Sequence, residues 1–395
     1  MKKLLFVLLL VFSISQLPAH DRLPWLKTEG GGIIDSKGST FVFRGINLGG
    51  WLAEEMWMLP FKKNPGKKGV VEIKDYVTLW STVERRFGKA GMERIRKTMR
   101  NEWLAEADFA KIALSGFNCV RLPFYYDIME EPTGLFLWLD RAIELASKYN
   151  IYVILDMHGT PGRQSSEQHT GAENCCRLFF DSTCVQKTCE IWAKIAERYK
   201  NRSVVAGYDL INEPMGAPNN VILYLVQDQI YRAIRAHDTK HIIFIEDGFK
   251  GLDHMPNPAV AGWKNVVYST HTYPSVEGSE KEMQQLIEKI VALRTAFKTP
   301  IYLGEFNVKS NDKAKVLQQF IAQLQAHEIS WSLWTYKLVG DKGKDSMWGL
   351  YNRPKKLKKI DLVEDSMETV LKKLQQLRTE NLKENKDLLA ALRFN

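Results

Sequence analysis

Short apolar runs alternate with longer amphipathic stretches along most of this chain. The runs are typical of buried strands, and the stretches between them have the periodicity of helices. The runs are predicted as eight strands, at 44–47, 117–122, 151–155, 204–211, 241–245, 266–270, 299–305 and 330–334. Because strands that alternate with helices form parallel sheets, the pattern predicts an α/β protein with a single closed (β/α)8 TIM barrel.

The segments between the strands complete this prediction. An N-terminal hairpin, 32–38 followed by 41–43 with its turn at 36–38, is expected to plug the barrel floor. The predicted helices lie within 72–98 and at 103–114, 136–149, 185–200, 219–237, 279–297, 311–326 and 361–378. The first connection is unusually long, and long loops after barrel strands surround the site.

The chain has no linker rich in Pro, Gly or Ser, so one domain is predicted over 20–378. Residues 379–395 are predicted to be a charged, helical tail. A monomer is expected.

The first 19 residues have the organisation of a signal peptide. Lys2 and Lys3 precede an apolar run, 4–12, which is followed by Leu17-Pro-Ala19. A membrane anchor is the alternative, but this run is shorter than the roughly 20 residues that cross a bilayer. The prediction is therefore a secreted or periplasmic protein without an integral membrane span after cleavage.

The composition excludes disordered and collagen-like classes, because 45% of the 395 residues are hydrophobic and 26% are charged. The formal net charge of +9 becomes +7 when Lys2 and Lys3 are removed with the leader. Much of the excess lies at 355–359, which is better explained by a solvated helix face than by a nucleic-acid groove. No nucleic-acid partner is expected.

Four of the five cysteines, Cys175, Cys176, Cys184 and Cys189, lie within fifteen residues. In an exported protein this cluster favours disulfides, with pairing left open. Zinc is the alternative, but the C-x-x-C spacing is absent. Cys119 lies in an apolar strand and is predicted to pack as a small hydrophobe.

Polar and aromatic residues stand at the ends of several predicted strands, and in a barrel all of these ends converge on one face. Glu213 and Glu305 are 92 residues apart, which corresponds to three strand-helix units of about 31 residues. The candidate site residues are Arg121, His158, Asn212, Glu213, His271, Tyr273, Glu305 and Trp334. Taken singly, each has a structural alternative, such as a turn residue, a core ion pair or a core aromatic.

Two facing carboxyl groups suit cleavage of a glycosidic bond. The apolar neighbours Pro214 and Met215 favour a protonated Glu213, the acid, whereas hydrogen bonds from Arg121 and Tyr273 would keep Glu305 ionised as the nucleophile. Further carboxylates near strand ends are expected to be supporting or solvent-facing: Asp156, Asp209, Glu246 and Asp247. No metal or cofactor is required.

These residues stand in motifs that resemble glycoside hydrolase family 5, the cellulase-like retaining barrels. The motifs are V-R-L-P with Arg121, L-D-M-H with His158, N-E-P with Glu213, H-T-Y with His271 and Tyr273, G-E-F with Glu305, and Trp334. The resemblance covers about 33–352 and implies that Glu213 is the acid/base and Glu305 the nucleophile. It also implies that Asn212 binds the sugar 2-hydroxyl, that Arg121, His271 and Tyr273 orient Glu305 and the sugar, that His158 lines the subsite, and that Trp334 is its stacking floor.

The stretch R-G-I-N-L-G-G-W-L, 44–52, resembles the exo-β-1,3-glucanase branch of this family, in which Glu54 or Glu55 would bind a terminal glucose. A β-linked carbohydrate is the expected substrate, a β-glucan first, with β-mannan or a glycolipid glucoside as alternatives. Trp51 and Trp57 are candidates for stacking on sugar, while the loops 159–184 and 341–351, the latter with Trp348, do not follow that branch.

Two other function classes remain to be compared. A barrel that binds carbohydrate without cleavage would be expected to lack the acid or the nucleophile, and both are present. A serine esterase would need a G-x-S-x-G elbow, which the sequence lacks.

Overall fold

The computed structural model describes residues 23–392, apart from 65, 67, 70, 132, 133, 135, 275–278, 309–312 and 342–347. The predicted leader, 1–19, lies outside these residues. Within the described chain, no helix is both long and apolar enough to cross a bilayer.

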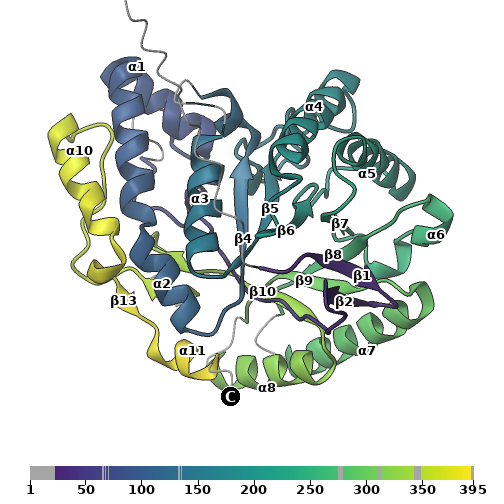
Figure 1. Cartoon of the computed structure of the whole chain (residues 1–395). Coiled ribbons are helices and arrows are strands. Elements are labelled where there is room, and N and C mark those ends of the chain that lie inside the picture. Colours follow the sequence, from purple (N-terminus) through teal and green to yellow (C-terminus); the bar gives the residue numbers. More distant parts are fainter. Residues whose placement is uncertain are drawn as a thin grey trace, which may run out of the picture.

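The centre of the fold is a closed parallel barrel of eight strands, as predicted (Figure 1). Its strands are β3 (Arg44–Asn47), β4 (Cys119–Tyr125), β5 (Tyr152–Gly159), β6 (Val205–Asp209), β7 (Ile242–Glu246), β8 (Val266–Thr272), β9 (Ile301–Phe306) and β10 (Ser330–Leu333). The barrel closes where β10 pairs with both β3 and β9. Each strand is almost wholly buried, which explains the apolar runs that predicted them.

Alternation along each strand decides what the barrel interior holds. On β4, Cys119 packs in an interior cluster, whereas Val120 and Leu122 pack outward in the core beneath the helices. Arg121, two residues after Cys119, also points into the barrel. It lies closer to the carboxyl ends of the strands, where it contacts residues from several other strands. An apolar floor therefore supports a polar upper layer.

The N-terminal hairpin covers that floor, as expected, but its strands are β1 (Leu26–Glu29) and β2 (Gly32–Asp35). The predicted turn at 36–38 is present and leads to a single bridge between Ile34 and Thr40. Leu26 and Ile33 pack in the same cluster as Cys119. The prediction missed β1 because its sequence, Leu-Lys-Thr-Glu, has only one apolar residue.

The helices surround the barrel (Figure 1). They are α1 (Tyr76–Trp103), α2 (Glu106–Leu114), α3 (Leu137–Lys148), α4 (Ser182–Tyr199), α5 (Asn220–Arg235), α6 (Pro258–Ala261), α7 (Ser279–Phe297), α8 (Lys313–Ala326), α10 (Met367–Leu374) and α11 (Lys386–Ala391). Short 3-10 turns are η1 (Tyr126–Glu130), η2 (Gln168–Thr170), η3 (Leu252–His254), η4 (Gln375–Leu377) and η5 (Thr379–Asn381).

The long first connection contains α1, whose backbone breaks at Gly88 with a φ of 68°. A helix was predicted to begin at Trp103 and run over 103–114. Trp103 instead ends α1, and the next helix, α2, begins at Glu106. The chain is extended at Leu104, and the Asp108 carboxylate then accepts a hydrogen bond from the Ala105 N–H at 2.7 Å, at the start of α2.

The C-terminal residues are part of the fold. A small sheet joins β11 (Lys337–Leu338), β12 (Tyr351–Asn352) and β13 (Lys383–Glu384), and α11 packs against α8. The tail predicted as charged and helical over 379–395 is a helix at α11 but a strand at β13. The predicted helix 361–378 is shorter, because α10 begins after the Ser366 cap.

Candidate active site

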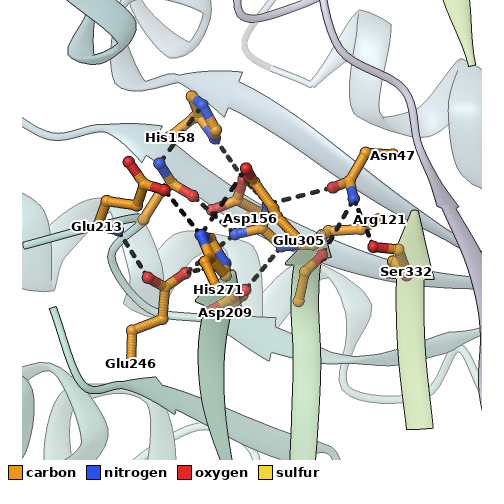
Figure 2. Close-up of polar contacts among 12 residues, drawn as sticks. Asn47, Arg121, Asp156, His158, Asp209, Glu213, Glu246, His271, Glu305 and Ser332 are labelled. Atoms are coloured by element: carbon orange, nitrogen blue, oxygen red, sulfur yellow. Dashed lines mark hydrogen bonds and ion pairs between the residues drawn. The ribbon is translucent and has the colours of Figure 1, made fainter. Parts of the chain in front are cut away.

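The carboxyl ends of the barrel strands surround a cavity of about 210 Å³. Its lining residues are Glu55, Trp57, His158, His169, Asn212, Glu213, Tyr273, Glu305, Trp334 and Trp348. Six of these were predicted from their strand-end positions. The two other predicted residues, Arg121 and His271, lie behind this lining and hold it in place (Figure 2).

Glu213 and Glu305 face each other across the cavity. One carboxylate oxygen of each, together with a ring nitrogen of His271, lies within 4.8 Å of the others. Glu213 follows β6 with a φ of 43°, a left-handed conformation that few residues other than glycine adopt. Its backbone N–H donates to Oε2 of Glu246 at 2.7 Å, which fixes this turn.

Glu305 accepts two strong hydrogen bonds. Nη1 of Arg121 donates to Oε1 at 2.7 Å, and the Tyr273 hydroxyl donates to Oε2 at 2.5 Å. The side chain is only 5% exposed. Short bonds to both oxygens fix the orientation of this carboxylate.

Arg121 joins the strands of the site (Figure 2). Its partners are Asp156 at 3.1 Å, Asp209 at 2.9 Å, Glu246 at 3.0 Å, Glu305 at 2.7 Å, Asn47 at 3.2 Å and Asn212 at 2.9 Å. One buried guanidinium thus faces four carboxyl groups. Burial raises the pKa of Asp156 well above its usual value, and it raises that of Glu246 against the opposing charge of His271.

None of the four supporting carboxyl groups faces solvent. Asp156, Asp209 and Glu246 belong to this network, and Asp247 accepts a hydrogen bond from the Thr270 hydroxyl at 3.1 Å. The prediction of a supporting role is thus correct for Asp156, Asp209 and Glu246. The alternative prediction, that these carboxylates face solvent, is wrong for all four.

Glu213 has a different environment from the one predicted. Nδ1 of His271 lies 2.9 Å from its Oε1, and Nε2 of His271 lies 3.3 Å from Glu246. Burial lowers the pKa of His271, but the charges of Glu246 and Glu305 outweigh burial and place it well above its usual range.

The protonated His271 lowers the pKa of Glu213, to which it hydrogen-bonds. Burial raises the pKa of Glu213, but the hydrogen bond from His271 and the charge of His169 outweigh it and lower the pKa to about 2. The expectation that apolar neighbours keep Glu213 protonated is therefore wrong for the sugar-free protein.

His158, Asn212 and Trp334 form one side of the cavity. The His158 ring stacks on Trp334 at 5.6 Å between centroids and 13° between planes, and its Nδ1 lies 2.7 Å from Asp156. Burial lowers the pKa of His158 to about 3, so the ring is neutral at neutral pH. Oδ1 of Asn212 is taken by Arg121.

The opposite side is aromatic and acidic. Trp348 stacks on Tyr273 at 5.5 Å and meets Trp57 edge-on at 6.1 Å. The indole N–H of Trp57 donates to Glu55 at 2.6 Å. Of the alternatives raised by the sequence, Glu55 and Trp57 thus line the cavity.

The two other candidates from that stretch are structural. Glu54 pairs with Arg100 at 3.1 Å, and both side chains are fully buried. The Trp51 ring is buried in the core, and its indole N–H donates to the backbone carbonyl of Arg100 at 2.9 Å.

The sequence prediction missed His169, Gln164 and Asn47. His169 lies on η2 in the loop after β5, with Nε2 3.6 Å from Oε2 of Glu213. Gln164, from the same loop, donates to the backbone carbonyl of Asn212 at 2.7 Å. A loop position gives no periodic signal, whereas Asn47 ends the first strand and could have been included by the strand-end criterion.

All five cysteines are described, and none forms a disulfide. Cys176 packs at Gly216 and Cys184 at Gly162, so close that a Cβ on either glycine would collide with the sulfur. The predicted disulfide cluster is thus not observed. Cys119 is buried, as predicted.

Among the described residues, two clusters have the composition of a metal site. Glu213, His271 and Glu305 are the facing carboxylates with their histidine. Asp156, Asp209 and Glu246 surround the guanidinium of Arg121, which already supplies a cation. We assign a metal to neither.

Comparison with known proteins places this arrangement in context. The model of the family Cellulase (glycosyl hydrolase family 5) matches residues 77–338. A β-xylosidase from Phanerodontia chrysosporium is 27% identical over 357 residues, which cover 81% of this chain and 72% of the relative. A probable glucan 1,3-β-glucosidase A from Aspergillus fumigatus is 29% identical over 383 residues, covering 78% and 87%.

Two solved structures share the fold at low sequence identity. The rutinosidase from Aspergillus niger has a TM-score of 0.62 at 18% identity and covers 76% of this chain and 91% of its own. An endogalactoceramidase has a TM-score of 0.58 at 20% identity, covering 89% and 85%.

Proposed function

Because the chain belongs to glycosyl hydrolase family 5 and is a β-glycoside hydrolase, we propose that it cleaves β-glucosidic bonds with retention at the anomeric carbon. The observation that carries this proposal is the short distance across the cavity between Glu213 and Glu305, whose nearest oxygens lie within 4.8 Å. Retaining enzymes have carboxyl groups about 5–5.5 Å apart, whereas inverting enzymes leave room for water at about 6.5–9.5 Å.

In the first step, a carboxylate oxygen of Glu305 attacks the anomeric carbon. The bond from that carbon to the leaving oxygen breaks, and Glu213 gives its proton to that oxygen. The products are a glycosyl ester on Glu305 and a free alcohol. Arg121 and Tyr273, which hold the two oxygens of Glu305, orient the nucleophile for this attack.

In the second step, the Glu213 carboxylate takes a proton from water while the water oxygen attacks the anomeric carbon. The ester bond to Glu305 breaks, the sugar is released, and both glutamates regain their starting protonation states. Two displacements on one carbon restore its configuration.

The remaining side chains suit a sugar ring. Trp334 offers an aromatic face. Arg121 holds the amide oxygen of Asn212 and Nε2 of His158 lies 3.4 Å from its amide nitrogen, so one N–H remains for a sugar 2-hydroxyl. Glu55, only 4% exposed, would accept hydrogen bonds from hydroxyls at the far end of a terminal glucose.

The cavity volume of about 210 Å³ favours one sugar ring over a longer stretch of polysaccharide. Drug-sized ligands fill pockets of roughly 300–1,000 Å³. A β-glucan with a terminal glucose in this cavity is the substrate we propose, and β-mannan and glycolipid glucosides are the alternatives. The non-catalytic binding barrel is set aside, because the chain is a glycoside hydrolase.

The test uses 2,4-dinitrophenyl β-glucoside, laminarin, cellulose, mixed-linkage glucan and mannan. Wild type should release glucose whose first-formed anomer, followed by NMR, is β. Glu305→Ala should lose activity by about 10⁴-fold or more on every substrate. Glu282→Ala, an exposed substitution on α7, is the control for expression and handling.

Glu213→Ala separates the acid/base role from other roles. Its slow hydrolysis of the dinitrophenyl glucoside should accelerate with azide, which attacks the glycosyl ester without a base and yields β-glucosyl azide. Release of the α anomer by wild type would overturn retention, and full activity of Glu305→Ala would overturn the nucleophile assignment.

A further inference from the structure

His169 lies beside Glu213, yet the two-step reaction leaves it without a role. Its Nε2 is 3.6 Å from Oε2 of Glu213, and its ring meets His158 edge-on at 6.0 Å. The side chain is 14% exposed, and Nε2 is a buried atom that has no hydrogen-bond partner within the described chain. A buried polar atom without a partner is costly, so its position calls for an explanation.

The two oxygens of Glu213 differ in what they contact. Oε1 is held by His271 at 2.9 Å, so Oε2 is the oxygen left to meet the leaving group. His169 is the residue that lies against this second oxygen. Any movement of His169 therefore acts on the oxygen that would transfer the proton.

The loop that carries His169 is held from both sides. Gln164 ties it to the backbone of Asn212, directly before the acid/base, at 2.7 Å. On the other side, the Val77 N–H of α1 donates to the Gly171 carbonyl at 3.1 Å. Such anchoring is what a residue needs to position another group.

We propose that His169 is a positioning residue for the acid/base, holding Oε2 of Glu213 so that it meets the departing oxygen. The inference rests on the proposed function. At 3.6 Å, Nε2 lies just beyond hydrogen-bonding distance of Oε2, so a small approach when a sugar is bound would let the ring donate to it, and the charge of His169 favours the carboxylate. The chain thus has a loop residue that adjusts how readily Glu213 gives and takes its proton.

Other groups face this pair as well, and they remain in place when His169 is changed. They are His271 and Tyr273 at the end of β8, Glu246 on β7, His158 on β5, Glu305 on β9 and Glu55 in the loop after β3. Loss of the His169 charge should raise the pKa of Glu213, because that charge is one of the causes of its low value.

The experiment compares leaving groups. Methyl β-glucoside needs a proton from Glu213 to depart, whereas 2,4-dinitrophenolate leaves without one. His169→Ala should lower kcat/KM for the methyl glucoside by about tenfold and change that for the dinitrophenyl glucoside by less than about twofold. The basic limb of its kcat for the methyl glucoside, which reports the pKa of Glu213 in the sugar-bound enzyme, should move to higher pH by about one unit.

His169→Gln keeps a hydrogen-bonding group without the charge. It should recover most of the methyl glucoside activity while keeping the shifted basic limb. Glu167→Ala, an exposed substitution in the same loop, is the matched control and should behave as wild type. Thermal unfolding of each variant checks that the fold is kept.

Each outcome decides the inference. Equal losses on both substrates with an unmoved basic limb, or no loss at all, would overturn the positioning role while leaving the proposed function intact. Inactivity of wild type on every β-glucoside would overturn the proposed function and this inference with it.

Discussion

The position of protons at the site depends on charges that come from several strands. His271 is held in its charged form by Glu246 and Glu305, and it donates to Glu213. In the sugar-free protein this favours an ionised acid/base. A bound sugar that weakens the contact with His271, and that excludes water, is expected to raise the pKa of Glu213 and return its proton.

Asp238 offers a cleaner test of a single buried charge. It is 1% exposed and accepts hydrogen bonds from the Tyr208 hydroxyl at 2.7 Å and from the backbone N–H groups of Lys240 at 2.8 Å and His241 at 3.1 Å. Burial raises its pKa, but the hydrogen bond and charge of His241 outweigh burial and lower it to about 2.

A carboxyl whose pKa falls on folding stabilises the fold above its unfolded value, near 3.8, and this stability is lost as pH falls toward 2. Asp238→Asn should therefore lower the free energy of unfolding by about 2 kcal/mol at pH 7, with a smaller difference at pH 2 to 3. Urea unfolding from pH 2 to 8 measures this. The exposed Asp253→Asn is the control, and a constant difference at all pH values would contradict the assignment.

At the scale of elements, the start of α1 connects two loops of the barrel: the long connection after β3 and the loop after β5, which carries His169. Asp75 caps α1 by accepting from the Thr78 N–H at 2.8 Å through Oδ1. Its other oxygen, Oδ2, accepts from the Glu173 N–H at 2.8 Å. One side chain thus fixes a helix and a loop that are far apart in sequence.

Asp75→Ala should cost about 1–2 kcal/mol of stability, as the loss of a helix cap does. It should also speed cleavage of the loop 163–177 by protease, because the Glu173 N–H loses its partner. Asn219→Ala is the matched control, since Asn219 caps α5 by accepting from the Ile222 N–H at 3.0 Å. It should cost similar stability with no change in cleavage of that loop, and equal cleavage in both variants would contradict the link.

At the scale of the molecule, the barrel and most of its site were predictable because both follow from one rule. Apolar runs are strands, parallel strands end on one face, and polar residues at those ends meet there. Glu305, Tyr273 and Arg121 obey this rule. The lowered pKa of Glu213 does not follow from this rule, because it depends on His271 and His169, which approach from other elements.

The parts that were predicted wrongly have no periodic pattern of their own. The cysteines near 175–189 suggested disulfides by number and spacing, but none is observed, and the sulfurs of Cys176 and Cys184 pack at Gly216 and Gly162. The C-terminal segment reads as a charged tail because its first nine residues, 379–387, include only one apolar residue, Leu382. Leu388 and Leu392 are nevertheless 2% and 1% exposed, so this segment contributes to the core.

The last helix should therefore matter to the stability of the whole barrel. Leu388→Ala removes a buried side chain from α11 and should lower the free energy of unfolding by about 3 kcal/mol. Leu114→Ala is the matched control, because Leu114 on α2 is 88% exposed and its loss should change little. Deletion of 379–395 should destabilise the protein at least as much as Leu388→Ala. Urea unfolding compares all three, and a wild-type midpoint in the deletion variant would mean that 379–395 is a dispensable tail after all.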